Sequence, residues 1–269
     1  MKLPISAFVI CKNEADFIGP CIDSLHMCQE IIVVDSGSTD GTLEVINEYI
    51  SAGWPIKLLF EEWRGYGGQK QFALEQCTLD WCFSVDSDER ISPKLAKTLP
   101  DLISTTEDLV AWEVTRFDYI NGYGYVPPKS HERFHVRLFK RNKGWFDPTD
   151  IVHEGIHVSG PTKKAKVGGL LHFRSIRLEE EIQKKNKYSS LKAELKRSRG
   201  IKSKPIKMLF SPVMFFLRWY VGHGLWRCGW AGFIHAMNGA IYSFLTEAKR
   251  FEDEAMERVH PVEPSGKGY

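Results

Sequence analysis

The sequence predicts an α/β domain followed by a helical C-terminal region. Over the first 90 residues, runs of apolar and β-branched residues alternate with polar loops and with segments of helical period. Strands that are apolar along their whole length are typical of sheets covered by helices on both faces. Beyond residue 175 the pattern changes to long stretches of helical character, the first basic and the next apolar.

Four strand-and-loop units account for the α/β pattern. The strands are predicted at residues 5–11, 30–35, 56–60 and 81–85. Helices are predicted after the first three strands: one that reaches Leu25, one that begins near Thr42 and one that follows Gly65. Because ligands of open α/β sheets bind at the carboxyl ends of the strands, the loops that follow these strands are expected to form a site.

Two carboxylates follow the fourth strand, in the sequence Asp86-Ser87-Asp88. Mg²⁺ and Mn²⁺ prefer oxygen ligands, and Mg²⁺ is usually held by one or two carboxylates together with the phosphates of a substrate. The pair therefore indicates a divalent-cation site whose ligand carries a diphosphate. The same residues are also typical of a turn or a helix start, where their side chains accept hydrogen bonds from backbone N–H groups.

Three ordered motifs resemble those of the family 2 glycosyltransferases, which are inverting enzymes that use nucleotide-activated sugars. They are Ile-Cys-Lys-Asn-Glu at residues 10–14, Val-Asp-Ser-Gly-Ser-Thr-Asp-Gly-Thr at 34–42 and Val-Asp-Ser-Asp-Glu at 85–89. The resemblance implies a GT-A, Rossmann-like nucleotide-sugar-binding domain with a mixed central sheet.

The resemblance and the change of pattern near residue 175 together predict a division of the chain. The GT-A domain covers residues 1–175, the helical region covers residues 176–260, and residues 261–269 are expected to form a flexible tail.

Two later motifs, at residues 152–154 (Val-His-Glu) and 171–173 (Leu-His-Phe), are similar to those of the branch that adds a sugar to the lipopolysaccharide core. This narrower resemblance implies transfer of a hexose, such as glucose from UDP-glucose, to a heptose of the lipid-linked inner core. The alternatives are a sugar-phosphate nucleotidyltransferase and a non-catalytic, membrane-associated adaptor with a vestigial GT-A fold.

The resemblance places the nucleotide pocket at the ends of the predicted strands. Asp35 is expected to read the base, since a carboxylate can accept a hydrogen bond from uracil N3–H. Lys70 is expected to offer a cation to the diphosphate, with Gln69 and Gln71 as competing choices. The nucleotide-binding residues implied in this way are Val9, Ile10, Cys11, Glu14, Asp35, Lys70 and Asp86.

A divalent cation, Mg²⁺ or Mn²⁺, is the cofactor that the resemblance implies. Asp88 is expected to be its main ligand and Asp86 to contact either the ribose or the metal. The cation would neutralise charge on the departing nucleoside diphosphate. His172 follows a short apolar run, and it is expected either to complete the metal shell or to be a structural hydrogen-bonding group.

An inverting transfer needs a base that takes the proton from the acceptor hydroxyl, and such a base is usually a carboxylate. The resemblance implies that Glu154 is this base, because the family keeps its acceptor-side acid in this region. Many relatives have Glu-Asp here, whereas this chain has His153-Glu154, so the imidazole of His153 is an alternative. Asp150 is a third candidate, although Pro148-Thr149-Asp150 is equally typical of a turn.

The basic and apolar segments in the second half of the chain predict contact with a membrane surface. Lys and Arg number 15 against 4 Asp and Glu over residues 163–207, but 15 against 24 over residues 1–162. Residues 178–198 predict an amphipathic helix with a basic end. The apolar stretches at 208–217 and 225–245 are too short or too interrupted to span a bilayer, which needs about 20 apolar residues.

Two amphipathic segments lying in the membrane interface, next to a basic helix, are therefore the favoured interpretation. A helical hairpin packed on the catalytic domain, or in a homo-oligomer contact, is the alternative. No nucleic-acid-binding motif accompanies the basic residues, so nucleic acid is not an expected partner.

The protein is expected to be cytoplasmic and peripherally associated with the inner face of the cytoplasmic membrane. Its first four residues lead directly into a strand pattern, without the apolar core of a secretion signal. The six cysteines form neither a Cys-x-x-Cys pair nor a zinc-binding spacing, which indicates reduced thiols.

Overall fold

The computed structural model describes residues 2–105, 108–126, 133–148, 155–174 and 177–258. The chain divides into two compact units. The α/β unit comprises Met1–Asp118 and Glu132–Arg174, and the helical unit comprises Tyr119–His131 and Ser175–Tyr269. One boundary between the two units lies near residue 175, where the sequence pattern changes. The segment that follows Asp118 belongs to the helical unit.

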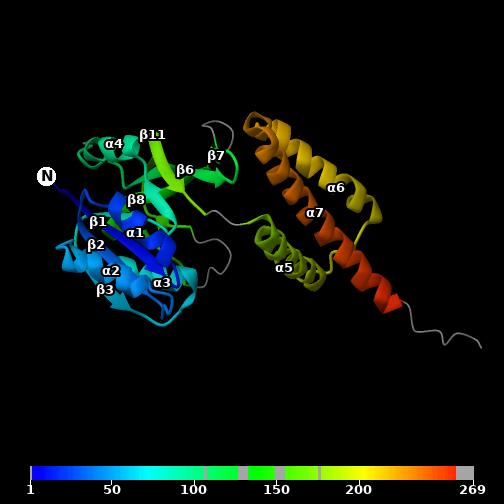
Figure 1. Ribbon diagram of the computed structural model, residues 1–269, viewed down its shortest axis with the longest axis horizontal. Coiled ribbons are helices and arrows are strands. Elements are labelled where there is room, and N and C mark those ends of the chain that lie inside the picture. The colour runs from blue at the N-terminus through cyan, green and yellow to red at the C-terminus, as the bar shows by residue number, and fades with distance from the viewer. Residues whose placement is uncertain (1, 106–107, 127–132, 149–154, 175–176, 259–269) are drawn as a thin grey trace, which may run out of the picture. The chain divides into compact units, whose positions relative to one another are not determined.

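The α/β unit is built on a mixed sheet (Figure 1). Its described strands follow the order β3-β2-β1-β4-β8-β6-β11-β5, and β7 pairs with the end of β6. Strands β3, β2, β1 and β4 are parallel, whereas β8 is antiparallel to both of its neighbours. The strands are β1 (Leu3–Cys11), β2 (Cys28–Asp35), β3 (Ile56–Phe60), β4 (Trp81–Ser84), β5 (Glu89–Ile91), β6 (Ala111–Ile120), β7 (Gly124–Tyr125), β8 (Arg133–Lys140) and β11 (Thr162–His172).

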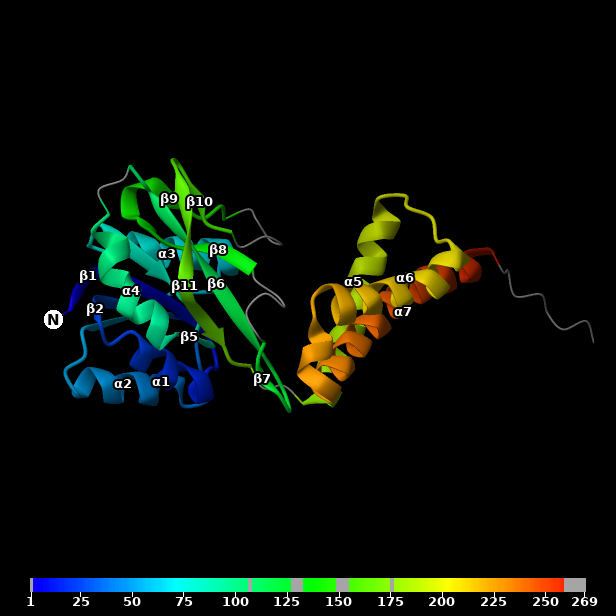
Figure 2. The same cartoon turned by 90° about the horizontal axis from the view of Figure 1, so that it is seen from above.

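Helices cover both faces of this sheet, because its central strands are apolar on both sides. In β1, Ala7 and Val9 face a core that includes side chains of α1 (Ala15–Ser24), α2 (Thr42–Ser51) and α4 (Pro93–Ile103). Phe8 faces the opposite core, to which α3 (Gly65–Glu75) contributes. Figure 2 shows α1 and α2 on one side of the sheet and α3 on the other. The predicted α/β class and mixed central sheet are confirmed.

The parallel strands end at one edge of the sheet and bring their loops together. The register pairs Cys11 with Asp35 at the ends of β1 and β2. Asn13 holds a left-handed conformation (φ 57°), and its side chain accepts a hydrogen bond from Thr39 N at 2.8 Å. Its own N–H donates to Ser38 Oγ at 2.9 Å. The loop after β1 is therefore fixed against the loop after β2.

The described residues of the helical unit form three long helices: α5 (Leu178–Ser198), α6 (Pro205–Leu217) and α7 (Gly229–Arg258). The predicted helix at 178–198 is confirmed as α5. A π-helical turn at Arg218–Gly222 and a 3-10 turn at Leu225–Cys228 connect α6 to α7. Helix α7 contacts both α5 and α6. A chain of ion pairs joins α5 to α7, since Glu247 contacts Lys196 and Arg250, each at 2.6 Å.

Helices α6 and α7 expose apolar side chains at helical spacing. No helix among the described residues is long and apolar enough to cross a membrane. Every residue of α6 is at least partly exposed, including Leu209 at 69%, and Trp230 of α7 is 80% exposed. We call these two rows the apolar stripes, and they consist of Ile206, Leu209, Phe210, Val213, Met214 and Leu217 on α6 and Trp230, Ile234, Met237, Ile241 and Phe244 on α7.

The six cysteines are all unpaired and buried, as the prediction of reduced thiols requires. Burial raises the pKa of Cys28 to about 12, and it also raises the pKa of Cys21 and Cys228. A raised pKa leaves little of the reactive thiolate at neutral pH.

Candidate functional site

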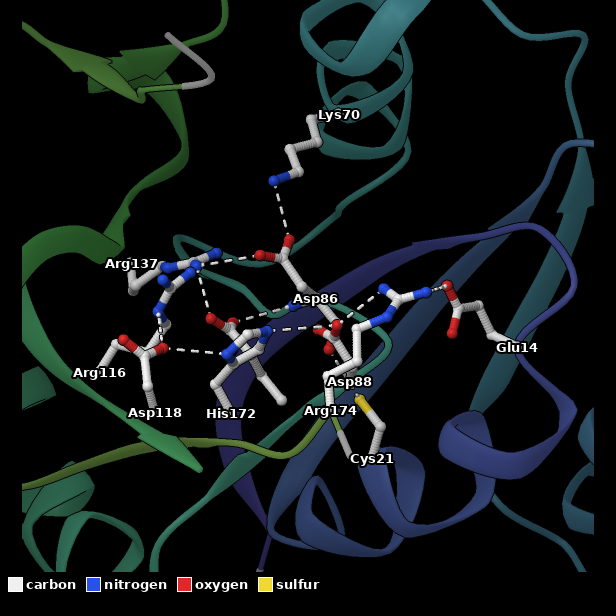
Figure 3. A network of polar contacts seen from close by, with 11 residues as sticks. Glu14, Cys21, Lys70, Asp86, Asp88, Arg116, Asp118, Arg137, His172 and Arg174 are labelled. Atoms are coloured by element: carbon white, nitrogen blue, oxygen red, sulfur yellow. Dashed lines mark hydrogen bonds and ion pairs between the residues drawn. The ribbon is translucent and has the colours of Figure 1, made fainter. Parts of the chain in front are cut away.

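A cleft of about 620 Å³ opens at the carboxyl ends of β1 and β4. Its volume lies within the range of about 300–1,000 Å³ that is typical of small-molecule sites. Charged side chains from several strands and helices converge on it (Figure 3). The cleft is lined by residues 10–14, Trp63, Tyr66, Lys70, residues 86–88, His172 and Arg174.

Asp86 lies between two cations at the floor of the cleft. Lys70 Nζ is 2.8 Å from Asp86 Oδ1, and Arg137 Nη2 is 3.1 Å from Asp86 Oδ2. Arg137 also contacts Glu89, at 2.8 Å. Burial opposes ionisation of Asp86, but Arg137 and Lys70 outweigh it and hold the pKa of this carboxyl well below its usual value. Asp86 is therefore a charged part of an ion-pair network (Figure 3).

Lys70 is one of three neighbouring polar residues that the sequence leaves as candidates for the diphosphate cation. Gln69 is fully buried, and its amide nitrogen donates to Ser36 Oγ and to the Glu61 carbonyl, both at 3.0 Å. Gln71 accepts a hydrogen bond from Phe146 N at 2.9 Å. Of the three, Lys70 is the residue that lines the cleft.

Asp88 and His172 lie side by side in the cleft. The distance between Asp88 Oδ2 and His172 Nε2 is 3.3 Å, and His172 Nδ1 lies 3.0 Å from Asp118 Oδ1. Burial would lower the pKa of His172, but its hydrogen bonds to Asp118 and Asp88 raise it to about 9. The interaction with His172 in turn lowers the pKa of Asp88, against the effect of burial. The pair is therefore charged at neutral pH.

The donor atoms of Asp88 and His172 suit a small divalent cation. Adjacent ligands of an octahedral ion at about 2.1 Å lie roughly 3 Å apart, close to the observed separation. A histidine that ligates through Nε2 usually gives its Nδ1–H to a carboxylate, which is the role that Asp118 has here. Among the described residues no three His, Cys, Asp or Glu side chains gather into a complete metal site. Two protein ligands supplemented by substrate phosphates are the arrangement that Mg²⁺ often adopts.

Arg174 covers the open side of these carboxylates. Its Nη1 lies 3.0 Å from Asp88 Oδ2, and its Nη2 lies 3.4 Å from Glu14 Oε1. The other carboxylate oxygen of Glu14 is buried and has no hydrogen-bond partner among the described residues. Burial raises the pKa of Glu14, although Arg174 opposes this effect. One face of the cleft thus holds a guanidinium between two acids.

A model of the family described as Glycosyl transferase family 2 matches residues 6–158. The chain belongs to this family. It is 50% identical over 256 residues to the lipopolysaccharide core biosynthesis glycosyltransferase LpsC of Rhizobium meliloti, with 95% of each chain covered. It is also 29% identical to an uncharacterized glycosyltransferase of Rickettsia felis, over 91% of this chain and 88% of that protein.

Among solved structures, TarS 1-349 of S. aureus in complex with UDP is similar, with a TM-score of 0.47 and 16% identity. The match covers 94% of this chain and 92% of that one.

The predicted nucleotide-binding residues of this glycosyltransferase occupy different positions. Ile10, Cys11, Glu14, Lys70 and Asp86 line the cleft. Val9 is fully buried in the core below it.

Asp35 is 2% exposed and lies outside the cleft lining. Its Oδ2 accepts hydrogen bonds from Gly37 N at 2.8 Å and Ser38 N at 2.9 Å, which shape the loop after β2. Cys11 Sγ also lies 3.7 Å from its Oδ1. Base recognition by Asp35 remains a prediction.

The predicted bases of the glycosyltransferase, Glu154, His153 and Asp150, lie outside the described residues. The chain on both sides of them is described. Trp145 in β9 (Gly144–Trp145) stacks on His157 in β10 (His157–Val158), with ring centroids 5.7 Å apart. Their role as bases stays a prediction.

Sequence reasoning missed four charged residues of the site: Glu89, Asp118, Arg137 and Arg174. Arg116 also contacts Asp118, at 3.1 Å. Asp118, Arg137 and Arg174 reach the site through strand pairing or chain return over long sequence separations. Glu89 lies only three residues from Asp86, and its side chain accepts a hydrogen bond from the Asp86 N–H. The available signal was the presence of Arg137 between the apolar residues Val136 and Leu138 of β8, since a charged residue in a buried strand needs a partner.

Proposed function

We propose that this glycosyltransferase transfers a hexose, such as glucose from UDP-glucose, to a heptose of the lipid-linked lipopolysaccharide inner core, with inversion at the anomeric carbon. The observation that carries this proposal is the 50% identity over 95% of both chains to LpsC, a protein named for lipopolysaccharide core biosynthesis. Family membership favours this function over the nucleotidyltransferase and adaptor alternatives.

The cleft supports a nucleoside diphosphate sugar as the donor. Lys70 and Arg174 present positive charge to it, which suits a diphosphate. At its rim, Trp63 and Tyr66 form an edge-to-face pair with ring centroids 4.8 Å apart, and they are 47% and 51% exposed. Exposed aromatic faces of this kind can stack on a nucleobase or a sugar ring.

Asp88 and His172 are the residues that would hold Mg²⁺ or Mn²⁺, with Asp86 beside them. Such a cation, when bound, would offset the negative charge that develops on the leaving nucleoside diphosphate. Asp118 would keep the His172 ring oriented toward it. Lys70 lies 2.8 Å from Asp86 on this side of the cleft.

The proposed reaction is a single displacement. The acceptor hydroxyl oxygen forms a bond to the anomeric carbon of the donor sugar, and the bond from this carbon to the diphosphate oxygen breaks. The electron pair of the broken bond leaves with the nucleoside diphosphate, and the hydroxyl proton passes to the base. Glu154 is the proposed base, with His153 and Asp150 as alternatives.

The apolar stripes support association with the cytoplasmic face of the membrane, where a lipid-linked acceptor would be available. A homo-oligomer contact is the alternative use of the same surface. Flotation with vesicles of phosphatidylglycerol and phosphatidylethanolamine tests the membrane association. Replacing Leu209 and Phe210 together by Ser should weaken vesicle binding at least about tenfold, because two exposed apolar side chains are lost.

Met256→Ser is the control for this experiment, since Met256 is 72% exposed but lies outside the apolar stripes. Unchanged vesicle binding by the double variant would contradict membrane association through α6. Concentration-dependent self-association that the double variant abolishes would favour the homo-oligomer.

Calorimetric titration with UDP, UDP-glucose and GDP, first with Mn²⁺ and then with a chelator, tests the donor site. Binding of the uridine nucleotides that depends on the metal is expected, and Asp88→Asn should abolish it. Asp101→Asn, a change on the exposed surface of α4, should leave it intact. A nucleotidyltransferase would instead consume a nucleoside triphosphate and a sugar phosphate, and an adaptor would bind none of these ligands.

A further inference from the structure

Arg174 lies in the cleft beside Asp88, where both the proposed divalent cation and the diphosphate of the donor would bind. It follows β11 by two residues, and its guanidinium spans Asp88 and Glu14 from the solvent side of the cleft (Figure 3). The Asp88 and Glu14 side chains are 9% and 13% exposed, whereas that of Arg174 is 41% exposed. The arginine is therefore the solvent-exposed partner, and the two acids are the more buried ones.

The contact between Arg174 and Asp88 uses the oxygen that also faces His172. Arg174 Nη1 is 3.0 Å and His172 Nε2 is 3.3 Å from the same Asp88 Oδ2. A divalent cation about 2.1 Å from this oxygen would lie within about 5 Å of the guanidinium nitrogen. The two positive charges would compete for this single carboxylate oxygen and would repel each other there. Arg174 in this position consequently opposes metal binding in the absence of a donor.

A diphosphate would reverse this effect. It supplies the anion that separates the two cations, and it offers the guanidinium oxygen acceptors in place of the carboxylates. Arginine keeps its charge at any relevant pH and pairs with phosphate through two parallel N–H groups. The Phe17 ring, 5.7 Å from the guanidinium carbon, gives the side chain a further contact beside the cleft.

We propose that Arg174 neutralises Asp88 and Glu14 in the donor-free enzyme and transfers to the diphosphate when the donor binds, so that metal and donor bind cooperatively. This inference rests on the proposed function, because it assumes a nucleoside diphosphate donor and a divalent cation in this cleft. Arg174 is then a donor-binding residue and also the reason that the metal binds weakly alone.

Electron paramagnetic resonance titration with Mn²⁺ tests the inference without any turnover. Without nucleotide, Arg174→Ala and Arg174→Gln should bind Mn²⁺ about fivefold or more tightly than the unaltered enzyme, because the competing charge is gone. With Mn²⁺ present, the same variants should bind UDP about tenfold more weakly, since a charge-assisted contact to phosphate is lost. Arg177→Ala, at an exposed arginine three residues along the chain, should change neither affinity.

The inference is overturned if both Arg174 variants bind Mn²⁺ no more tightly than the unaltered enzyme, or if their affinity for UDP is unchanged. Failure of the proposed function has a different signature, in which the unaltered enzyme itself binds neither UDP nor UDP-glucose with Mn²⁺ present. Circular dichroism of each variant verifies that it is folded.

Discussion

Nδ1 of His172 lies 3.0 Å from Oδ1 of Asp118, so the ring presents its other nitrogen, Nε2, to Asp88. The parallel register of β6 and β11 produces this contact, because it pairs His172 directly with Asp118. The orientation of the candidate metal-binding nitrogen is thus set by backbone pairing as well as by a side-chain hydrogen bond.

Removing the Asp118 carboxylate should weaken metal binding without removing a metal ligand. Loss of such an outer partner typically costs about 10–100-fold in metal affinity, and we expect Asp118→Asn to fall in this range. Electron paramagnetic resonance titration with Mn²⁺ in the presence of UDP measures the metal affinity of this variant, with Asp101→Asn as the control. An affinity within twofold of the unaltered enzyme would show that Asp118 does not orient His172 toward a metal.

Metal affinity should rise with pH up to about 9. Metal ligation needs the neutral imidazole, whereas the pKa of His172 is raised to about 9 in the metal-free protein, so binding below this pH must release a proton. The apparent affinity should then increase about tenfold per pH unit. Mn²⁺ titrations between about pH 6.5 and 8.5 measure this slope. His172→Gln should bind more weakly and with a flatter slope, and a flat profile in the unaltered protein would exclude His172 as a ligand that must deprotonate.

Arg137 should be essential for stability. It is the shared partner of Asp86 and Glu89, and the Glu89 side chain is fully buried. Arg137→Met would leave the buried Glu89 carboxylate without this partner, a change that typically costs about 3–5 kcal/mol in the free energy of unfolding. Burial already raises the pKa of Glu89 to about 7, and Glu89→Gln in the same chain should restore part of the loss.

Chemical denaturation measures these free energies. Arg90→Met is the matched control, because Arg90 lies next to Glu89 but makes a cation–π contact with Phe173, worth about 0.5–1 kcal/mol. Equal losses for Arg137→Met and Arg90→Met would contradict the role of the buried network.

Gly67 should be required because the backbone at Asp147, which leads to the candidate base, packs directly against it. A Cβ at Gly67 would lie 2.3 Å from the carbonyl oxygen of Asp147. Gly67→Ala should therefore displace this backbone and cost about 1–3 kcal/mol in stability. We expect a lower kcat as well, because residue 154 follows soon after Asp147. Gly222→Ala meets no atom within 4 Å and serves as the control; thermal unfolding and initial rates are the measurements.

Substitution at the candidate bases should separate donor binding from transfer. Glu154→Gln is expected to keep the affinity for UDP-glucose and to lower kcat about 10²–10⁴-fold, the usual contribution of a general base. His153→Gln and Asp150→Asn should retain most of their activity. Calorimetry gives the affinity and release of UDP gives the rate. Unchanged turnover in Glu154→Gln, with a loss in either of the other two, would move the role of base to that residue.

Local sequence pattern was sufficient for several of the secondary-structure elements. The apolar run at 56–60 and the amphipathic segment at 178–198 coincide with β3 and α5, because periodicity and charge decide such segments locally. Asp88, Lys70 and His172 were likewise found at strand ends or helix starts, where an α/β sheet presents its ligand-binding side chains.

The ion pairs within the site could not be predicted in the same way. Arg137 meets Asp86 across 51 residues of sequence, and Arg174 meets Asp88 across 86. These contacts depend on the place of β8 beside β4 and on the return of β11 beside β6 and β5, and neither pairing has a local signature. Sequence pattern thus found the side chains at the parallel strand ends and missed their partners on strands that arrive later.

The burial of all six cysteines should make the folded protein slow to react with thiol reagents, with Cys11, which lines the cleft, as the most accessible of them. Five of them lie in the α/β unit and one, Cys228, lies in the helical unit. The rate of alkylation at each position, followed by mass spectrometry, would therefore time the opening of each unit separately. The same low reactivity should allow a single cysteine introduced on an exposed position of α6 to carry a spin label or a fluorophore with little background from the native thiols.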